Sequence, residues 1–394
     1  METIQYLPSQ EDNHKFWSSV PAEASSHAKL PTGFPTHVDY PSSWGRSLIL
    51  TRRSEWIFKL TELDIEQIER ALQRLDENHV DYPSISPQTF SLPSDLCQRL
   101  RKISDELYTG SGIAMLKGLD PSRYTQAQNV KLFAGIASHI AAQRGFLDWD
   151  RQKVLSHVTN VSGPSSKARR RTPGFTNSPL AFHTDCCEIL ALYALNVAED
   201  RGRTLVSSSH QLYNDLAANY PEVLQTLAND WVLDTFQDYS KHPPKKVPCL
   251  YRGADDDRPI IRFSRFPMTG FEEKRRNAAL PVPSRAQVEA LNTVQFLAEK
   301  NSVPLPMENG DLILINDTTI LHGREGYDDA ESTRAKRHLL KMYLRDPLRK
   351  TNIPESLREE QEMIYGPNGE DGQVLETWFP DHDPDLEGHW LKNG

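Results

Sequence analysis

The stretch Ala181-Phe182-His183-Thr184-Asp185-Cys186-Cys187-Glu188 leads into an apolar run, Ile189-Leu190-Ala191-Leu192-Tyr193-Ala194-Leu195. Side chains alternate across an extended strand, so His183 and Asp185, two positions apart, point to the same side. Their imidazole nitrogen and carboxylate oxygen can meet at one point. This is two thirds of the 2-His-1-carboxylate face that binds non-haem Fe(II) and leaves coordination positions open. The alternative is a turn in which Asp185 only caps a backbone N–H.

A histidine that could complete this face lies far downstream. The segment 309–323 predicts a Gly-Asp turn, a β-branched strand and a short link that carries His322 just before a glycine. Arg337 then opens a further strand-like segment that ends at Asp346. An arginine entering a strand presents a planar fork of donors that matches a carboxylate. We therefore expect a metal site with an anion-binding residue beside it.

In this order the motifs resemble the TauD/TfdA-like (taurine dioxygenase, clavaminate synthase-like) family of Fe(II)/2-oxoglutarate-dependent dioxygenases, and most closely its fungal-type members. The resemblance extends from about Ile57 to about Asp346. Besides the residues named above, it rests on the segments 116–120, 143–145, 175–180, 201–208 and 337–340. Each of these motifs is common alone, and only their combination and order identify the family.

The resemblance implies a role for each matching residue. His183, Asp185 and His322 correspond to the iron ligands. Thr204 corresponds to the hydroxyl that bonds the distal carboxylate of 2-oxoglutarate, and Arg337 to the ion-pair partner of that carboxylate. We therefore expect these five side chains to surround one pocket.

Substrate contacts are predicted by position only. Lys341 falls where taurine dioxygenase has a second arginine, and Lys341, Asn177 and Phe182 are the candidates. A lysine is a point charge and not a fork, so the geometry of a sulfonate site does not follow. The basic loop from Lys167 to Arg171 is either a solvated loop or a lid that meets an anionic substrate. Arg334 is a second candidate for the carboxylate partner, because the spacing from His322 is longer than in taurine dioxygenase.

The activity implied by the resemblance is oxidation of a small molecule, with Fe(II), 2-oxoglutarate and O2 consumed to give succinate and CO2. Hydroxylation is the expected outcome, desaturation or ring formation are variants, and secondary metabolism is the expected setting. Three alternatives stay open. A zinc-dependent hydrolase would need a general base, for which Glu188 is the nearby candidate. A zinc or copper site could use the Cys186 thiolate. The third alternative is a binding protein without turnover.

Composition excludes several classes of protein. The 394 residues carry a net charge of −9, which argues against a nucleic-acid partner. No segment has the length of a membrane span, and the first twenty or so residues do not resemble a signal peptide. The four cysteines lack disulfide-framework spacing, so we expect a reducing compartment and a cytoplasmic protein with a small-molecule partner.

The predicted organisation is an irregular arm (1–55), a single catalytic domain (56–346) and a tail (347–394). Helix starts are expected at Thr61-x-x-Asp64 and Ser284-x-x-Gln287. Short strands separated by turns favour a fold that is mainly β with a helical buttress, a double-stranded β-helix (jelly-roll, cupin-like) barrel with the metal at its mouth. The arm either packs on its own barrel or joins a homo-oligomer.

Four further polar residues have two interpretations each. His157 and His210 either line a pocket or are hydrogen-bonded structural residues, and the latter is the better expectation. Arg262 and Arg265 either point toward the pocket or form surface ion pairs.

Overall fold

The structure is a computed structural model that describes residues 4–18, 29–161, 172–198, 201–254, 256–328, 336–349 and 353–367. The basic loop around Lys167, the alternative carboxylate partner Arg334 and the end of the tail (368–394) lie outside these residues. Among the described helices, none is both long and apolar enough to cross a membrane.

The larger of two central sheets has seven strands in the order β1-β2-β15-β6-β17-β3, with β4 also paired to β17. Its strands are β1 (Ile57–Lys59), β2 (Ile113–Lys117), β3 (Gln143–Gly145), β4 (Ser156–Thr159), β6 (Ile189–Asn196), β15 (Leu312–Asn316) and β17 (His338–Arg345). Only β1 and β2 pair in parallel; the other pairs are antiparallel. Strand β6 is continuously apolar because both of its faces are buried.

The smaller sheet is antiparallel and carries the predicted histidine ligands. Its strands, in order, are β14 (Val303–Pro304), β7 (Thr204–Ser208), β16 (Ile320–Arg324) and β5 (Leu180–His183). The prediction that His322 lies in a link between strands is wrong, because it is the middle residue of β16. The link is shorter than expected: Asn316 Oδ1 accepts the N–H of Thr318, and this tight turn lets β16 begin at Ile320.

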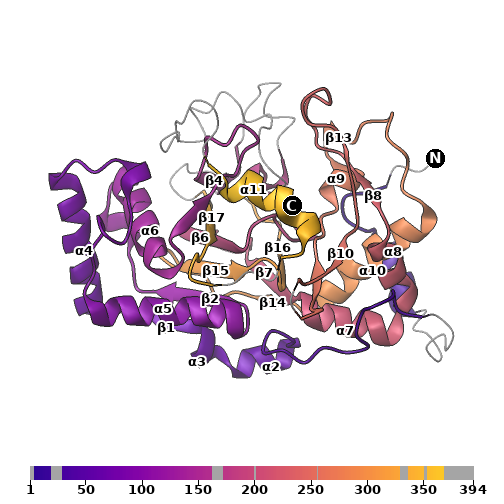
Figure 1. Ribbon diagram of the computed structural model, residues 1–394, viewed down its shortest axis with the longest axis horizontal. Coiled ribbons are helices and arrows are strands. Elements are labelled where there is room, and N and C mark those ends of the chain that lie inside the picture. Colours follow the sequence, from indigo (N-terminus) through magenta and orange to yellow (C-terminus); the bar gives the residue numbers. More distant parts are fainter. Residues whose placement is uncertain are drawn as a thin grey trace.

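Three helices cover the outer face of the larger sheet: α4 (Glu62–Glu77), α5 (Ser94–Thr109) and α6 (Gln126–Ile140). The predicted start of α4 is confirmed, since Thr61 and Asp64 form a reciprocal capping box. Leu72 and Leu75 on the apolar face of α4 join one core with Leu314 of β15. Figure 1 shows this group in indigo and purple at one end of the molecule.

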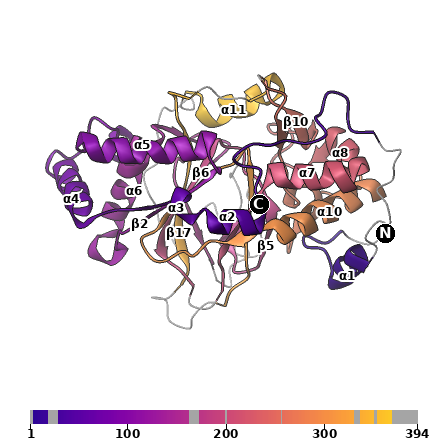
Figure 2. The ribbon, with the colours of Figure 1, turned by 90° about the horizontal axis from the view of Figure 1, so that it is seen from below.

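A second helical group covers the outer face of the smaller sheet, at the opposite end of the molecule (Figures 1 and 2). It consists of α7 (Ser209–Asn219), α8 (Pro221–Ala228) and α10 (Arg285–Asn301), and α10 begins at the predicted Ser284 capping box. Phe182 and Leu321 point from the sheet into this group's core. Helices thus cover both outer faces and contribute as much as the strands, so the predicted class "mainly β" is too narrow.

The remaining elements are short and lie around these layers. They are α9 (Phe266–Thr269) and the two-stranded pairs β8 (Trp231–Leu233) with β9 (Lys245–Val247), β10 (Leu250–Arg252) with β11 (Pro259–Ile261), and β12 (Gly270–Phe271) with β13 (Lys274–Arg275). The predicted hairpin around 253–258 is confirmed as β10–β11.

Both ends of the chain pack on the body. The arm contains α1 (Gln10–Ser18) and α2 (Arg46–Thr51), and α3 (Arg53–Trp56) follows it. Asn214 of α7 accepts the N–H of Val38 at 2.9 Å and donates to its carbonyl at 2.8 Å. After Asp346 the chain forms α11 (Arg358–Tyr365), which lies alongside the sheets and apart from both helical groups (Figures 1 and 2).

The inner faces of the two sheets line one pocket. Leu192 of β6 and Lys341 of β17 come from the larger sheet, whereas Thr204 of β7 and His322 of β16 come from the smaller one. The order of layers is therefore helices, larger sheet, pocket, smaller sheet and helices. This arrangement places the predicted site between the sheets.

Candidate metal and cosubstrate site

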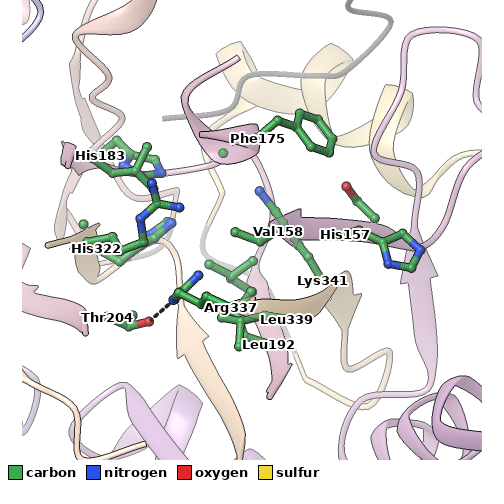
Figure 3. Close-up of a pocket in the computed structure, with 16 residues that line it drawn as sticks. His157, Val158, Phe175, His183, Leu192, Thr204, His322, Arg337, Leu339 and Lys341 are labelled. Atoms are coloured by element: carbon green, nitrogen blue, oxygen red, sulfur yellow. Dashed lines mark hydrogen bonds between the residues drawn. The ribbon is translucent and has the colours of Figure 1, made fainter. Parts of the chain in front are cut away.

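The three predicted metal ligands lie together. One side-chain donor atom from each of His183, Asp185 and His322 lies within 4.8 Å of the others, and all three residues are buried. The two imidazole rings have centroids 4.1 Å apart. Figure 3 shows them side by side at one side of the pocket. Of the residues that the structure describes, these three are the group suited to hold a metal ion.

Strand pairing brings the two histidines together. His183 is the last residue of β5, and it stands directly opposite His322 in the antiparallel pairing with β16. Asp185 follows in the turn after β5. Nδ1 of His183 and the carbonyl of Ala181 are 2.8 Å apart, so Nδ1–H donates there and Nε2 stays available as a ligand. For His322, Nε2 lies 3.8 Å from Oδ2 of Asp185.

The protonation states suit a metal site. Burial lowers the pKa of His183, and it lowers the pKa of His322 well below its ordinary value. Both shifts favour the neutral imidazoles that metal ligands must be. Burial alone would raise the pKa of Asp185, but that pKa is lowered, chiefly by the charge of Lys341 beside it. The site therefore offers two neutral nitrogens and one carboxylate.

Arg337 and Thr204 lie at the same pocket, as predicted. Nη2 of Arg337 donates to Oγ1 of Thr204 at 3.4 Å (Figure 3). Nε of Arg337 donates to the carbonyl of Gly202 at 3.0 Å. The guanidinium is buried, and burial and the nearby Arg324 lower the pKa of Arg337 to about 9. Its Nη1 has no hydrogen-bond partner among the described residues. A buried cation with an unused donor is suited to bind an anion.

Lys341 also reaches the site. It lines the pocket, and its Nζ lies 2.8 Å from Oδ2 of Asp185. The two groups form a buried ion pair, and Oδ1 of Asp185 accepts no hydrogen bond from a described residue. The predicted substrate contact therefore lies next to a predicted metal ligand.

The other two predicted substrate contacts do not line the pocket. The prediction that Phe182 contacts the substrate is wrong, because strand alternation turns its side chain away from His183 and into the core beneath α7, α8 and α10. The side-chain Nδ2 of Asn177 donates to the carbonyl of Tyr327 at 3.0 Å, and the backbone carbonyl of Asn177 accepts the N–H of Tyr327 at 3.0 Å. Its side chain is used to hold that segment.

Sequence reasoning missed Arg324. It lines the pocket, is buried, and stands opposite Thr204 in the pairing of β16 with β7. Its Nη2 donates to the carbonyl of Thr176 at 2.6 Å. The available signal was its position two residues after His322, which places both on one face of a strand. The predicted link at His322 carries no such alternation, so it gives no prediction for Arg324.

The structure also decides between the two interpretations given for two histidines, His157 and His210, and for two arginines, Arg262 and Arg265. His157 lines the pocket, and its Nδ1 lies 2.7 Å from Nε2 of His338. His210 is a buried structural residue whose Nδ1 lies 2.8 Å from Oγ of Ser42. Arg262 and Arg265 are buried and neither lines the pocket nor forms a surface ion pair, so both earlier interpretations of them are wrong.

Neither the zinc hydrolase nor the zinc or copper site on Cys186 has its required residue at the pocket. Glu188 is paired with Arg345 at 2.5 Å and with the hydroxyl of Tyr108 at 3.1 Å, and it does not line the pocket. It is therefore not placed as a general base. Cys186 belongs to the apolar core and not to the group of candidate ligands.

Comparisons with known proteins agree with this geometry. Residues 75–343 match the model of the family "Taurine catabolism dioxygenase TauD, TfdA family". The chain is 32% identical over 344 residues to taurine hydroxylase-like protein SAT17 of Stachybotrys chartarum, a match that covers 86% of this chain and 87% of the relative. It is 27% identical over 313 residues to FR-33289 synthase of Streptomyces rubellomurinus, covering 77% of this chain and 88% of the relative.

Solved structures share the fold. An asparagine oxygenase in complex with Fe(II), 2S,3S-3-hydroxyasparagine and succinate has a TM-score of 0.56 at 16% identity, covering 73% of this chain and 93% of its own. The non-haem iron oxygenase OrfP, in complex with Fe and alpha-ketoglutaric acid, has a TM-score of 0.56 at 16% identity, covering 81% of this chain and 99% of its own. The family match covers most of the chain, and SAT17 is similar over nearly all of its length. The chain therefore belongs to the TauD/TfdA family of dioxygenases, and the family and enzyme class predicted from the sequence, an Fe(II)/2-oxoglutarate-dependent dioxygenase, are confirmed.

Proposed function

We propose that this enzyme oxidises a small, anionic molecule, and that His183, Asp185 and His322 hold its Fe(II) while Arg337 and Thr204 hold 2-oxoglutarate. Fe(II), 2-oxoglutarate and O2 are the cofactors of its family, as the sequence predicted. One observation carries the assignment of residues: three buried ligand groups lie together, and the two histidines among them line a pocket that also contains a buried guanidinium with an unused donor.

The residues fit both groups. Oδ2 of Asp185 is paired with Lys341, whereas its Oδ1 accepts no hydrogen bond from a described residue and is available to a cation. Nη1 of Arg337 is equally available to a carboxylate, and Thr204 adds a hydroxyl beside it. When bound, the iron and 2-oxoglutarate supply the activation of O2, with release of succinate and CO2 and oxidation of a substrate C–H bond.

The chain itself contributes orientation and exclusion of water. Arg337, directly before β17 of the larger sheet, and Thr204, the first residue of β7 in the smaller sheet, would fix one end of the diacid. Leu190, Leu192 and Leu339 form an apolar wall of the pocket, which keeps bulk water from the reacting groups. We infer further that the two facing sheets close into the jelly-roll barrel predicted from the sequence, with this pocket at its mouth.

The charge of the pocket supports an anionic substrate. Arg324, Arg337 and Lys341 line it, whereas Asp185 is the carboxylate beside it. A divalent metal and a dianionic cosubstrate neutralise each other, and Asp185 offsets one more cation, so positive charge remains. Lys341 is the proposed contact, and the setting in secondary metabolism expected from the sequence is part of the same proposal.

Anaerobic titration tests the proposed ligand set. We expect Fe(II) and 2-oxoglutarate together to give a coloured charge-transfer complex with the parent enzyme. His322→Ala should weaken Fe(II) binding at least about 10-fold. His79→Asn, an exposed position, should leave it unchanged. An unchanged Fe(II) affinity in the His322 variant would refute the assignment.

Substrate-dependent succinate release tests the substrate class. A panel of small acids and their neutral amides should show turnover only with acids. Lys341→Met should raise KM for the acid about 10-fold, because one charged contact is lost, without changing the affinity for 2-oxoglutarate. Turnover that prefers the amides would contradict the anionic class.

A further inference from the structure

The turn that carries Asp185 has no strand partner of its own. Residues 184–188 lie between the end of β5 and the start of β6. The carbonyl groups of Asp185, Cys186 and Cys187 are buried and need donors from elsewhere. A ligand on such a turn is held only as firmly as those donors hold the turn.

Arg262 supplies most of these donors. Its Nη1 lies 3.3 Å from the carbonyl oxygen of Asp185 and 3.2 Å from that of Cys187, and its Nη2 lies 3.4 Å from that of Cys186. Arg262 follows β11 and is buried. One planar guanidinium therefore binds three consecutive carbonyls of the turn, which a lysine ammonium cannot do in the same geometry.

Asp317 links Arg262 to both ligand-bearing segments. Its Oδ2 accepts from Nη1 of Arg262 at 2.9 Å, and its Oδ1 accepts the backbone N–H of Asp185 at 2.8 Å. Oδ1 also lies 3.8 Å from Nδ1 of His322. Asp317 is fully buried in the turn before β16. The pair thus spans the two segments whose relative position defines the site.

Helix α11 holds the same turn from outside. Nε2 of Gln361 donates to the carbonyl of Cys186 at 3.0 Å, and the N–H of Glu188 donates to the hydroxyl oxygen of Tyr365 at 3.0 Å. Glu360 Oε1 lies 3.8 Å from Nε of Arg262. This helix follows residue 343, where the family match ends, so its contacts are additional to the shared core.

Buried ion pairs are weak evidence for stability, because the cost of removing two charges from water offsets their attraction. Here the charged groups of Arg262 and Asp317 bond the backbone of the turn that carries Asp185, and Asp317 also lies near His322. We propose that Arg262 is a positioning residue for the metal site, held by Asp317 and supported by α11, and that it sets the affinity for the metal by fixing the turn that carries Asp185. This inference rests on the proposed function of His183, Asp185 and His322.

The test compares metal affinity with folding in the full chain. Arg262→Lys keeps the charge but loses the fork, and Gln361→Leu removes one donor at nearly constant volume. Arg265→Lys is the matched control, because Arg265 is equally buried but bonds the carbonyls of Gln5 and Tyr6 and the side chain of Asn292. Each variant is titrated anaerobically with Fe(II), and its Tm is measured without metal.

Loss of one residue that orients metal ligands typically weakens metal affinity 10- to 100-fold, and we expect a loss of about this size for Arg262→Lys. Gln361→Leu should weaken it several-fold, because it removes the bond to the turn and the bond that Oε1 of Gln361 accepts from Arg345. Arg265→Lys should lower Tm but leave the Fe(II) affinity unchanged. At saturating Fe(II), all three should bind 2-oxoglutarate like the parent, since Arg337 is untouched.

Two results would overturn the proposal. The first is a lowered Tm with parental Fe(II) affinity in both Arg262→Lys and Gln361→Leu, which would mean a purely structural role. If Arg262→Lys does not fold, Gln361→Leu decides alone. The second is an equal loss of affinity in the Arg265 control. Asp185→Ala distinguishes a failure of the Arg262 proposal from a failure of the metal site on which it rests. If this variant also binds Fe(II) like the parent, the proposed metal site itself is wrong.

Discussion

Arg337 is a buried cation with a second cation, Arg324, nearby, and that environment is costly unless an anion is bound. Its pKa is lowered to about 9 by burial and by Arg324. Both guanidinium groups lie near the ring of Tyr327, with Cζ atoms 5.7 and 5.0 Å from its centroid. A carboxylate bound at Nη1 would offset the desolvation of Arg337. The same residue therefore gives the pocket its affinity for a diacid and its selectivity against neutral molecules.

Arg337→Met tests this role. Removing a charge-assisted contact costs about 2 kcal/mol, so the affinity for 2-oxoglutarate should fall roughly 30-fold while the affinity for Fe(II) alone stays the same. The control is Arg203→Met, which removes a guanidinium that pairs with Glu325 at the surface. Anaerobic titration of the Fe(II) enzyme with 2-oxoglutarate measures both variants, and parental affinity in Arg337→Met would contradict the assignment.

The sequence predicted the residues of the metal site better than those of the substrate site. A ligand triad has fixed chemistry, so His183, Asp185 and His322 could be named from residue type and order. Substrate contacts depend on which face of a strand a residue occupies. Because the strand that begins at Ile320 was not predicted, Arg324 was not recognised as a pocket residue. Alternation within β5 points Phe182 into the core and not into the pocket. The role of Arg262 was not predicted, because its partners are three backbone carbonyls, which leave no signal in the sequence, and Asp317, which is distant in the chain.

At the scale of elements, the pairing of β5 with β16 sets the distance between the two histidine ligands. Gly323 lies beside His322 in this pairing, and a Cβ at that position would lie 2.9 Å from the carbonyl oxygen of Leu180 in β5. The neighbouring atom belongs to the backbone, so it cannot rotate away. The two strands approach closely only because this position has no side chain.

Gly323→Ala should therefore separate the strands that carry the histidines. We expect destabilisation of about 1–3 kcal/mol, as for overpacking, and a weaker Fe(II) affinity. Gly45→Ala is the control, because a Cβ there would meet no atom within 4 Å. Chemical unfolding and Fe(II) titration give the two quantities. A Gly323 variant with parental values in both would show that the strand spacing is not under this constraint.

The sequence predicted elements with strong local signals. The capping boxes of α4 and α10 and the hairpin β10–β11 are where expected, because caps and turns depend on neighbouring residues. The packing of α11 beneath the turn after β5 was not predicted. It depends on contacts such as Gln361 to Cys186, between residues far apart in the chain.

At the scale of the whole molecule, two sheets enclose the site and the arm fastens to the outer helices. Ser42 of the arm bonds His210 of α7, and Asn214 bonds the backbone of Val38. His210 is buried, and burial followed by the charge of Arg258 lowers its pKa to about 3. The division at residues 55 and 346 stays a prediction, although both flanking segments pack closely on the body.

The buried His210 makes stability depend on pH. An unfolded histidine has a pKa of about 6.5, so between about pH 6.5 and pH 3 the unfolded chain binds a proton that the folded chain does not. The contribution of the neutral His210 to the free energy of unfolding is complete above pH 6.5. As pH falls below this value, the free energy of unfolding decreases by up to about 1.4 kcal/mol per pH unit. Urea unfolding of the metal-free protein from pH 6.5 to 5 should show this slope, and His210→Gln should reduce it. His79→Asn should keep it. Equal slopes in the parent and His210→Gln would contradict the prediction.

The most direct test of the central claim is anomalous diffraction at the iron edge, from crystals grown anaerobically with Fe(II) and 2-oxoglutarate. The account predicts one iron peak bonded by His183, Asp185 and His322, with the distal carboxylate of 2-oxoglutarate paired to Arg337. Iron bound at other residues, or a diacid whose distal carboxylate lies away from Arg337, would contradict it.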